Sequence, residues 1–251
     1  MLVLNNITCK PCTDFQIQIA QLELKPGQIV SVVGQNGSGK STFLKMLAGD
    51  YSYHGNIQLH QRCLTKYSGL ERAQHMAMMT QSYALNFAFK ASEVVTLGAS
   101  NLRLHAAQKQ QATHEMMQRL DCDLLKEKHY FSLSGGQQQR VQLARSLLQL
   151  AQAPRYPLLL VDEPISAQDL KYQHLVLQRL QDYALKHHYL IIAVLHDLNH
   201  ALHYSRSCLL FHRGKLVQHG PTKDVLTACH IEKYWGYKPK QFNSDTTHLF
   251  F

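Results

Sequence analysis

The chain has 251 residues, of which 45% are hydrophobic and 17% are charged, and its formal net charge is +9. This length allows one large domain or two small ones with an ample buried core. The longest apolar run, residues 189–195, is far shorter than the roughly 20 residues that cross a bilayer. The positive charge indicates an anionic partner, such as a nucleotide, a nucleic acid or an anionic membrane surface, without choosing among them.

The cysteines give no clear metal or disulfide pattern. The first residues lack the pattern of a secretory signal, so we expect a cytoplasmic protein whose six cysteines are reduced. Cys9 and Cys12 form a lone CxxC pair, and no second pair or nearby histidine completes a zinc set at the usual spacing. We favour ordinary thiols over a redox or metal role for this pair.

The first 80 residues predict strands around one helix. Phe15, Ile17 and Ile19 alternate with polar residues, as in a strand with one buried face. Strands are expected at residues 2–7, around 15–19, and at 29–33, 55–59 and 76–79. A glycine-rich loop follows residues 29–33, and a helix over 41–48 ends at Gly49.

In the second half, the strand pattern is absent from about residue 84 to 131, where apolar pairs indicate short helices. Strands and helices then alternate again. Helices are expected at about 136–152 and 169–186, and strands at 158–161 and 190–195. The pattern predicts an α/β fold with a mainly parallel sheet flanked by helices, an antiparallel β region near the N-terminus and an inserted helical subdomain.

The loop after residues 29–33 reads GQNGSGKS and matches GxxxxGK[ST] between a strand and a helix. Its glycines let consecutive backbone N–H groups point at phosphate oxygens, and the helix N-terminus adds its dipole. We expect Lys40 to reach the β- and γ-phosphates of ATP and Ser41 to offer its hydroxyl to Mg²⁺. The predicted phosphate-binding residues are Gly34, Gln35, Asn36, Gly37, Ser38, Gly39, Lys40, Ser41 and Thr42.

A pair of carboxylates follows the apolar strand at 158–161. A buried parallel strand that ends in Asp162 places this residue at the carboxyl edge of the sheet, beside the phosphate loop. Asp162 is suited to hold Mg²⁺ through a water, and Glu163 can polarise the water that attacks the γ-phosphate. The two motifs together predict a nucleotide hydrolase.

Residues 133–137, LSGGQ, followed by QQRV, resemble the signature of the ATP-binding-cassette (ABC) ATPases. The resemblance covers about residues 2–237 and implies a P-loop NTPase (RecA-like) core. It also implies three further roles. Gln81 resembles the glutamine that contacts Mg²⁺ and the attacking water, Asp169 the D-loop aspartate, and His196 the switch histidine that contacts the γ-phosphate.

The resemblance also implies a homodimer, because two cassettes of this family stack head to tail around two ATP molecules. Each chain then completes the opposite site. The residues implied to act in trans are Ser134, Gly135, Gly136, Gln137 and Asp169.

The chain departs from the family pattern in two ways. An aromatic residue that stacks on adenine is common near the end of the first strand pair, but residues 8–13 contain none, which leaves Phe15 as the candidate. Ile165 and Gln168 stand where threonine and leucine are common. Neither change removes a catalytic group, so ATPase activity is expected.

Within the family, residues 86–98 resemble the importers of iron chelates, heme and cobalamin, and residues 139–145 and 194–199 are most similar to the heme importers. The apolar residues 82–89 either pack in the helical subdomain or line a groove for a short permease helix.

The resemblance implies an ATPase at the cytoplasmic face of the inner membrane, with two transmembrane permease subunits and a periplasmic substrate-binding protein. Import of a ferric siderophore or cobalamin, or a soluble ATPase stimulated by nucleic acid, stays as an alternative, although no nucleic-acid partner is expected.

The resemblance implies a nucleotide-binding domain over residues 1–237, with its helical subdomain at about 84–150, and a C-terminal tail over 238–251. His196, His200 and His203 fall at helical spacing, which would also suit heme or metal ligation. We favour the γ-phosphate for His196 and ordinary helix positions for the other two.

Overall fold

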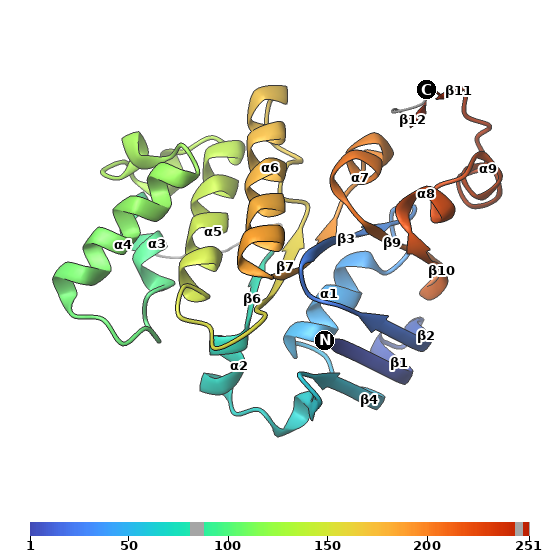
Figure 1. Ribbon diagram of the computed structural model, residues 1–251, viewed down its shortest axis with the longest axis horizontal. Coiled ribbons are helices and arrows are strands. Elements are labelled where there is room, and N and C mark those ends of the chain that lie inside the picture. Colours follow the sequence, from blue (N-terminus) through green and yellow to red (C-terminus); the bar gives the residue numbers. More distant parts are fainter. Residues whose placement is uncertain (81–87, 244–247, 251) are drawn as a thin grey trace.

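The computed structural model describes residues 1–80, 88–243 and 248–250, with the backbone alone for 241–243, 248 and 249. A ten-stranded sheet runs through the molecule in the order β5-β4-β1-β2-β10-β9-β3-β8-β7-β6. Helices lie on both of its faces (Figure 1). The sheet has a parallel half and an antiparallel half.

The parallel half contains the strands that end at the site. Its members are β6 (Met76–Met79), β7 (Leu158–Asp162), β8 (Leu190–Val194), β3 (Gln28–Val33) and β9 (Ser207–His212). Every residue of β7 and β8 is buried, which accounts for their continuous apolar sequence. The predicted parallel sheet is confirmed, with β9 as a member that the sequence analysis did not include.

The antiparallel half is built from the N-terminal strands and one late strand. Its members are β1 (Leu2–Cys12), β2 (Phe15–Leu24), β4 (Tyr53–Leu59), β5 (Arg62–Cys63) and β10 (Lys215–Pro221). β1 pairs with both β2 and β4, and β10 joins the two halves by pairing with β9 and β2. β1 extends beyond residue 7, where the predicted strand ended. Cys9 is therefore buried in a strand and Cys12 is exposed, and both thiols are free.

Two cores lie on opposite faces of the parallel strands, because successive side chains of a strand point to opposite sides. Val30 and Val32 of β3 face the core that contains α1 (Lys40–Ala48) and the N-terminal strands. Ile29 and Val33 face the larger core, which contains α5 (Gly135–Gln149), α6 (Leu170–His187) and α7 (Leu198–Tyr204). The sheet thereby fixes α1 and α5 on opposite faces.

Of the remaining helices, α3 (Ala91–Leu97) and α4 (Ala106–Arg119) lie at one end of the molecule, and α8 (Thr222–Val225) and α9 (Ala228–Trp235) lie at the other (Figure 1). A further helix, α2 (Gly69–His75), precedes β6, and short 3₁₀ turns lie at Leu64–Lys66, Asp123–Leu125 and Tyr130–Ser132. α3 packs on α4 and α5, and all three lie between β6 and β7 in the chain. Within the described ranges, no helix has the length and apolar character needed to cross a bilayer.

A hairpin of β11 (Gln241–Asn243) and β12 (His248–Phe250) forms the end of the described chain. The Asn199 side-chain amide of α7 donates to the carbonyl oxygen of Phe250 at 3.1 Å and accepts from its N–H at 2.9 Å. From the sequence, residues 238–251 were distinguished only as a C-terminal tail. The hairpin depends on pairing within the tail and on hydrogen bonds between Phe250 and Asn199 of α7, which no local pattern reveals.

Two leucines test how much the core contributes to stability. Leu44 of α1 is 0% exposed, whereas Leu124 is 88% exposed. Leu44→Ala should lower the free energy of unfolding by about 2–5 kcal/mol because it leaves a cavity. Leu124→Ala should change it by less than about 0.5 kcal/mol. Chemical denaturation of both variants measures the difference, and equal losses would contradict this description of the core.

Candidate functional site

The glycine-rich loop between β3 and α1 is packed too closely to admit side chains at two positions. A Cβ at Gly34, whose φ is 147°, would lie 2.2 Å from the carbonyl oxygen of Phe211. A Cβ at Gly39, whose φ is 106°, would lie 2.5 Å from Ile17. Gly37 also has a positive φ but faces open space. The glycines let the loop curl against β9 and β2 and present its backbone to a ligand.

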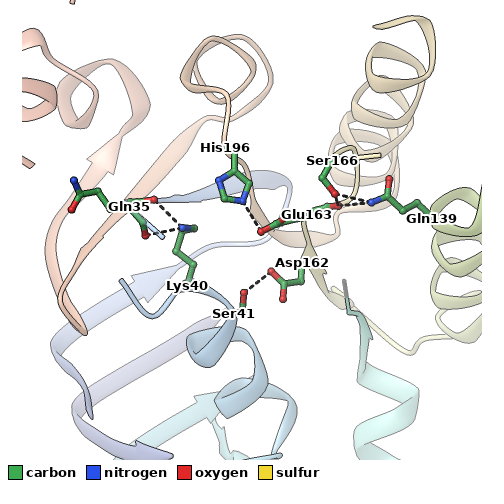
Figure 2. Close-up of polar contacts among 9 residues, drawn as sticks. Gln35, Lys40, Ser41, Gln139, Asp162, Glu163, Ser166 and His196 are labelled. Carbon is green, nitrogen blue, oxygen red and sulfur yellow. Dashed lines mark hydrogen bonds and ion pairs between the residues drawn. The ribbon is translucent and has the colours of Figure 1, made fainter. Parts of the chain in front are cut away.

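Lys40, the first residue of α1, places a cation over this loop. Its Nζ donates to the carbonyl oxygens of Gly34 at 2.8 Å and Gln35 at 3.0 Å (Figure 2). Burial lowers the pKa of the Lys40 ammonium, and the nearby Glu163 and Asp162 carboxylates partly oppose this shift. A positive charge at a helix N-terminus, beside inward-facing amides, is an arrangement that binds phosphate.

Ser41 and Asp162, which are 121 positions apart in the sequence, place two side-chain oxygen atoms next to each other. Asp162 ends β7, and the Ser41 hydroxyl donates to its Oδ1 at 3.0 Å (Figure 2). Burial raises the pKa of the Asp162 carboxyl, and the hydrogen bond from Ser41 opposes that shift. Hard oxygen donors of this kind fit Mg²⁺. The buried Ser38 hydroxyl, which has no hydrogen-bond partner among the described residues, fits a phosphate oxygen in the same loop.

Glu163 and His196 meet at the same edge of the sheet. Glu163 follows β7, His196 lies just after β8, and Oε1 of the carboxylate is 2.5 Å from Nε2 of the imidazole (Figure 2). The Glu163 side chain is 14% exposed and that of His196 is 44% exposed. The carboxylate is therefore largely shielded from water but accessible from the phosphate loop, as a general base for a bound substrate must be.

A cleft of about 440 Å³ lies between the phosphate loop and Glu163. It is lined by Phe15, Asn36, Gly37, Gly39, Lys40, Ser41, Thr42 and Glu163. Phe15, the first residue of β2, contributes the aromatic ring that residues 8–13 lack. The phosphate loop and Glu163 thus share a single cleft with an aromatic side chain.

The residues expected to act in trans lie apart from this cleft, at the starts of α5 and α6. Ser134 and Gln137 form a capping box, in which the Ser134 hydroxyl accepts from the Gln137 N–H at 3.4 Å and the Gln137 side chain accepts from the Ser134 N–H at 3.1 Å. A Cβ at Gly136 would lie 2.7 Å from the carbonyl oxygen of Ala167. Gly135 also faces Ala167, and Asp169 occupies the N-cap of α6.

Gln81 lies outside the described residues. His200 and His203 lie on α7, where the His200 ring is 5.5 Å from that of His174 and the His203 ring is 4.6 Å from that of Tyr204. Over residues 1–80, 88–243 and 248–250, no cluster of three or more acidic, histidine or cysteine side chains is arranged to hold a metal ion.

Gln139 is a site residue that the sequence analysis did not assign. Its side-chain amide reaches the carbonyl oxygen of Glu163 at 3.1 Å and the hydroxyl of Ser166 at 2.9 Å (Figure 2). The sequence feature that could have identified Gln139 is its polar side chain on a largely buried helix, just after the signature. Its partner could not be identified without the packing of α5 on the segment after β7.

The sequence model of the ABC transporter family matches residues 17–166. The chain belongs to the ABC transporter family. It is 40% identical to the hemin import ATP-binding protein HmuV of Shewanella denitrificans over 86% of this chain and 85% of the relative. It is 37% identical to the protein of the same name from Vibrio parahaemolyticus, over 93% of this chain and 90% of the relative.

Solved structures agree with this assignment. An inward-facing metal-chelate type ABC transporter matches with a TM-score of 0.81 at 25% identity, over 99% of this chain and 95% of that one. A dimeric ATP-binding cassette bound to ADP and Pi has the same fold, with a TM-score of 0.78 at 24% identity over 88% and 99%. The family resemblance and the P-loop α/β fold are therefore confirmed. The chain is an ABC importer ATPase subunit that binds nucleotide and couples ATP hydrolysis to transport.

Two glycines of the phosphate loop make a matched test of its packing. Gly34→Ala, at a φ of 147°, would drive a Cβ into the backbone of β9, whereas Gly37→Ala, at a φ of 75°, meets open space. Gly34→Ala should weaken ATP binding by at least about tenfold, because the loop must shift. Gly37→Ala should have a smaller effect. Titration with a fluorescent ATP analogue measures both, and equal affinities in the two variants would contradict the loop geometry.

Lys40 tests the electrostatic part of the site. Lys40→Ala removes the buried ammonium and should raise the dissociation constant for ATP by at least about tenfold. Lys186→Ala is the control, because Lys186 is 69% exposed and pairs with Asp182 on α6. Unchanged ATP affinity in Lys40→Ala would contradict the assignment of the phosphate loop.

Proposed function

We propose that this chain is the ATP-binding subunit of an importer of hemin. The ATP-binding part of the proposal is carried by one observation, the meeting of Lys40, Ser41, Asp162, Glu163 and His196 at the carboxyl edge of three parallel strands. The cargo is proposed from the relatives named as hemin import ATP-binding proteins, which are 36–40% identical over most of the chain.

In the proposed mechanism, the loop amides and Lys40 hold the phosphates of ATP, with Gly34, Gln35, Asn36, Gly37, Ser38, Gly39 and Thr42 completing the cradle. Glu163 Oε1 accepts a proton from water as the water oxygen attacks the γ-phosphorus and the bond to the β–γ bridging oxygen breaks. His196, 2.5 Å from that carboxylate, keeps it oriented and contacts the γ-phosphate. Gln81 is assigned to the same water.

Mg²⁺ is proposed as the cofactor, and Ser41, Asp162 and Gln81 are the residues proposed to hold it. When bound, the ion neutralises negative charge on the phosphate oxygens. The Ser41 hydroxyl and Asp162 carboxylate, 3.0 Å apart, are suitable oxygen donors from this chain.

The proposed assembly is a head-to-tail homodimer at the cytoplasmic face of the cell membrane, peripheral to two transmembrane permease subunits. Ser134, Gly135, Gly136, Gln137 and Asp169 of each chain face the nucleotide held by the other. A periplasmic binding protein delivers hemin, and nucleic acid is not a partner. Phosphate release loosens the dimer, and the Gln81 region passes this change to the permease.

The domain assignment is part of the proposal. Residues 1–237 form the nucleotide-binding domain, with a helical subdomain over about 84–150, and residues 238–251 form a C-terminal tail. The insertion of α3, α4 and α5 between β6 and β7 supports the subdomain.

Import of a ferric siderophore is the second candidate function. The solved metal-chelate type transporter that matches 99% of this chain favours it. Cargo contacts lie in other subunits, so the two candidates share every ATPase assignment and differ only in what the complex transports.

The deciding experiment reconstitutes the chain with its permease in lipid and measures ATPase activity with binding protein loaded with hemin, a ferric siderophore or cobalamin. Stimulation by hemin-loaded protein alone is expected. Stimulation by another cargo would contradict hemin import and leave the catalytic assignments in place. ATPase stimulation by DNA or RNA, without stimulation by any cargo, would contradict the transport function.

Glu163→Gln tests the general base. The variant should bind ATP, dimerise and hydrolyse ATP about 10²–10⁴-fold more slowly, because the amide cannot accept the proton. Asp182→Asn is the control, since this half-exposed carboxylate of α6 pairs with Lys186 far from the cleft. Single-turnover hydrolysis measures both variants, and fast turnover in Glu163→Gln would remove Glu163 from the base role.

A further inference from the structure

The backbone of Glu163 adopts a conformation that must be held by its surroundings. Its φ is 53°, in the left-handed region that residues with a Cβ rarely occupy. Such residues persist only where neighbouring contacts determine them, and they cluster at functional sites. The carboxylate of Glu163 points to His196, so a rotation of this backbone would also move the proposed general base.

The backbone carbonyl group of Glu163 accepts a hydrogen bond from the Gln139 side chain. The Gln139 amide Nε2 donates to this carbonyl oxygen at 3.1 Å and to the Ser166 hydroxyl at 2.9 Å (Figure 2). Its Oε1 accepts from the N–H of Ala167 at 3.3 Å, and the Ser166 hydroxyl donates to the Glu163 carbonyl oxygen at 3.3 Å. Both ends of one buried amide therefore bind the segment that leaves β7.

The helix that carries Gln139 is itself fixed against this segment. There is no room for a Cβ at Gly136, 2.7 Å from the Ala167 carbonyl oxygen, so α5 approaches residues 166–168 at backbone distance. The guanidinium of Arg140, which is buried, lies 3.7 Å from the centre of the Tyr172 ring on α6. These contacts give the Gln139 amide a defined position rather than a flexible one.

We propose that Gln139 is a positioning residue for ATP hydrolysis. It holds the left-handed backbone of Glu163 so that the carboxylate stays aimed at the attacking water. This inference rests on the proposed role of Glu163 as the general base. Gln139 does not line the cleft, and its hydrogen bonds go to residues 163, 166 and 167 and not to Lys40 or the phosphate loop. Its loss therefore changes the rate of the chemical step and leaves nucleotide affinity intact.

Two substitutions in the full chain separate the donor from the acceptor of the amide. Gln139→Leu removes both, and Gln139→Glu keeps the size and the acceptor for Ala167 but loses the donor to Glu163. Both variants should lower kcat by about tenfold or more, with the dissociation constant for ATP within about twofold of the wild-type value. Unchanged kcat in both variants beside an active wild-type chain overturns this inference alone, whereas an inactive wild-type chain contradicts the proposed function.

Gln149→Leu is the matched control. Gln149 is the same residue type on the same helix, and its Nε2 donates to the carbonyl oxygens of Ala73 and Met76 at 2.9 Å each. Its loss removes comparable hydrogen bonds far from Glu163, so kcat should stay at the wild-type value. An equal fall in kcat would assign the effect to the stability of α5 and overturn the proposal.

A double-mutant cycle excludes a purely structural role. If Gln139 acts through the Glu163 carboxylate, adding Gln139→Leu to Glu163→Gln should lower the residual hydrolysis rate by less than about twofold. A further tenfold loss in the double variant would show that Gln139 acts independently of that carboxylate and would overturn the proposal.

Discussion

The site depends on the register of three parallel strands. Val32 of β3 pairs with Val194 of β8, which in turn pairs with Asp162 of β7, so the three strands end at the same level. The segments that follow these strands all begin at the same edge of the sheet. The phosphate loop, the two carboxylates and His196 therefore lie close together. A shift of one residue in any of these pairings would turn the buried side chains to the opposite face and move the site residues with them.

Lys40 and Asp162 stabilise each other's charged form at this edge of the sheet. Lys40 and Asp162 are each almost fully buried, and burial alone lowers the pKa of the ammonium and raises that of the carboxyl. Each group opposes the shift of the other, and Ser41 adds a hydrogen bond to Asp162. Buried charges are costly unless they are paired and hydrogen-bonded. Removal of Lys40 would therefore leave the buried Asp162 carboxylate with less compensation for its burial.

The sequence predicted those features of the site that depend on residues close together in the chain. The glycine loop between a strand and a helix, and Asp162 at the end of a buried strand, follow from composition and spacing. The length of β1 was underestimated, because the segment from Thr8 to Cys12 is polar and becomes a strand only by pairing with β2 and β4. Gln139 could not be assigned, since its bond to Glu163 joins residues 24 positions apart through tertiary packing. The trans roles of the signature residues and the role of Gln81 stay predictions.

The most direct test of the account is the structure of Glu163→Gln with ATP and Mg²⁺. We expect a γ-phosphate between Lys40 Nζ and His196, with Mg²⁺ beside Ser41 and Asp162, and the opposite chain's signature loop closing the site. A nucleotide bound elsewhere, or a γ-phosphate out of reach of residue 163, would contradict the claim that this edge of the sheet hydrolyses ATP.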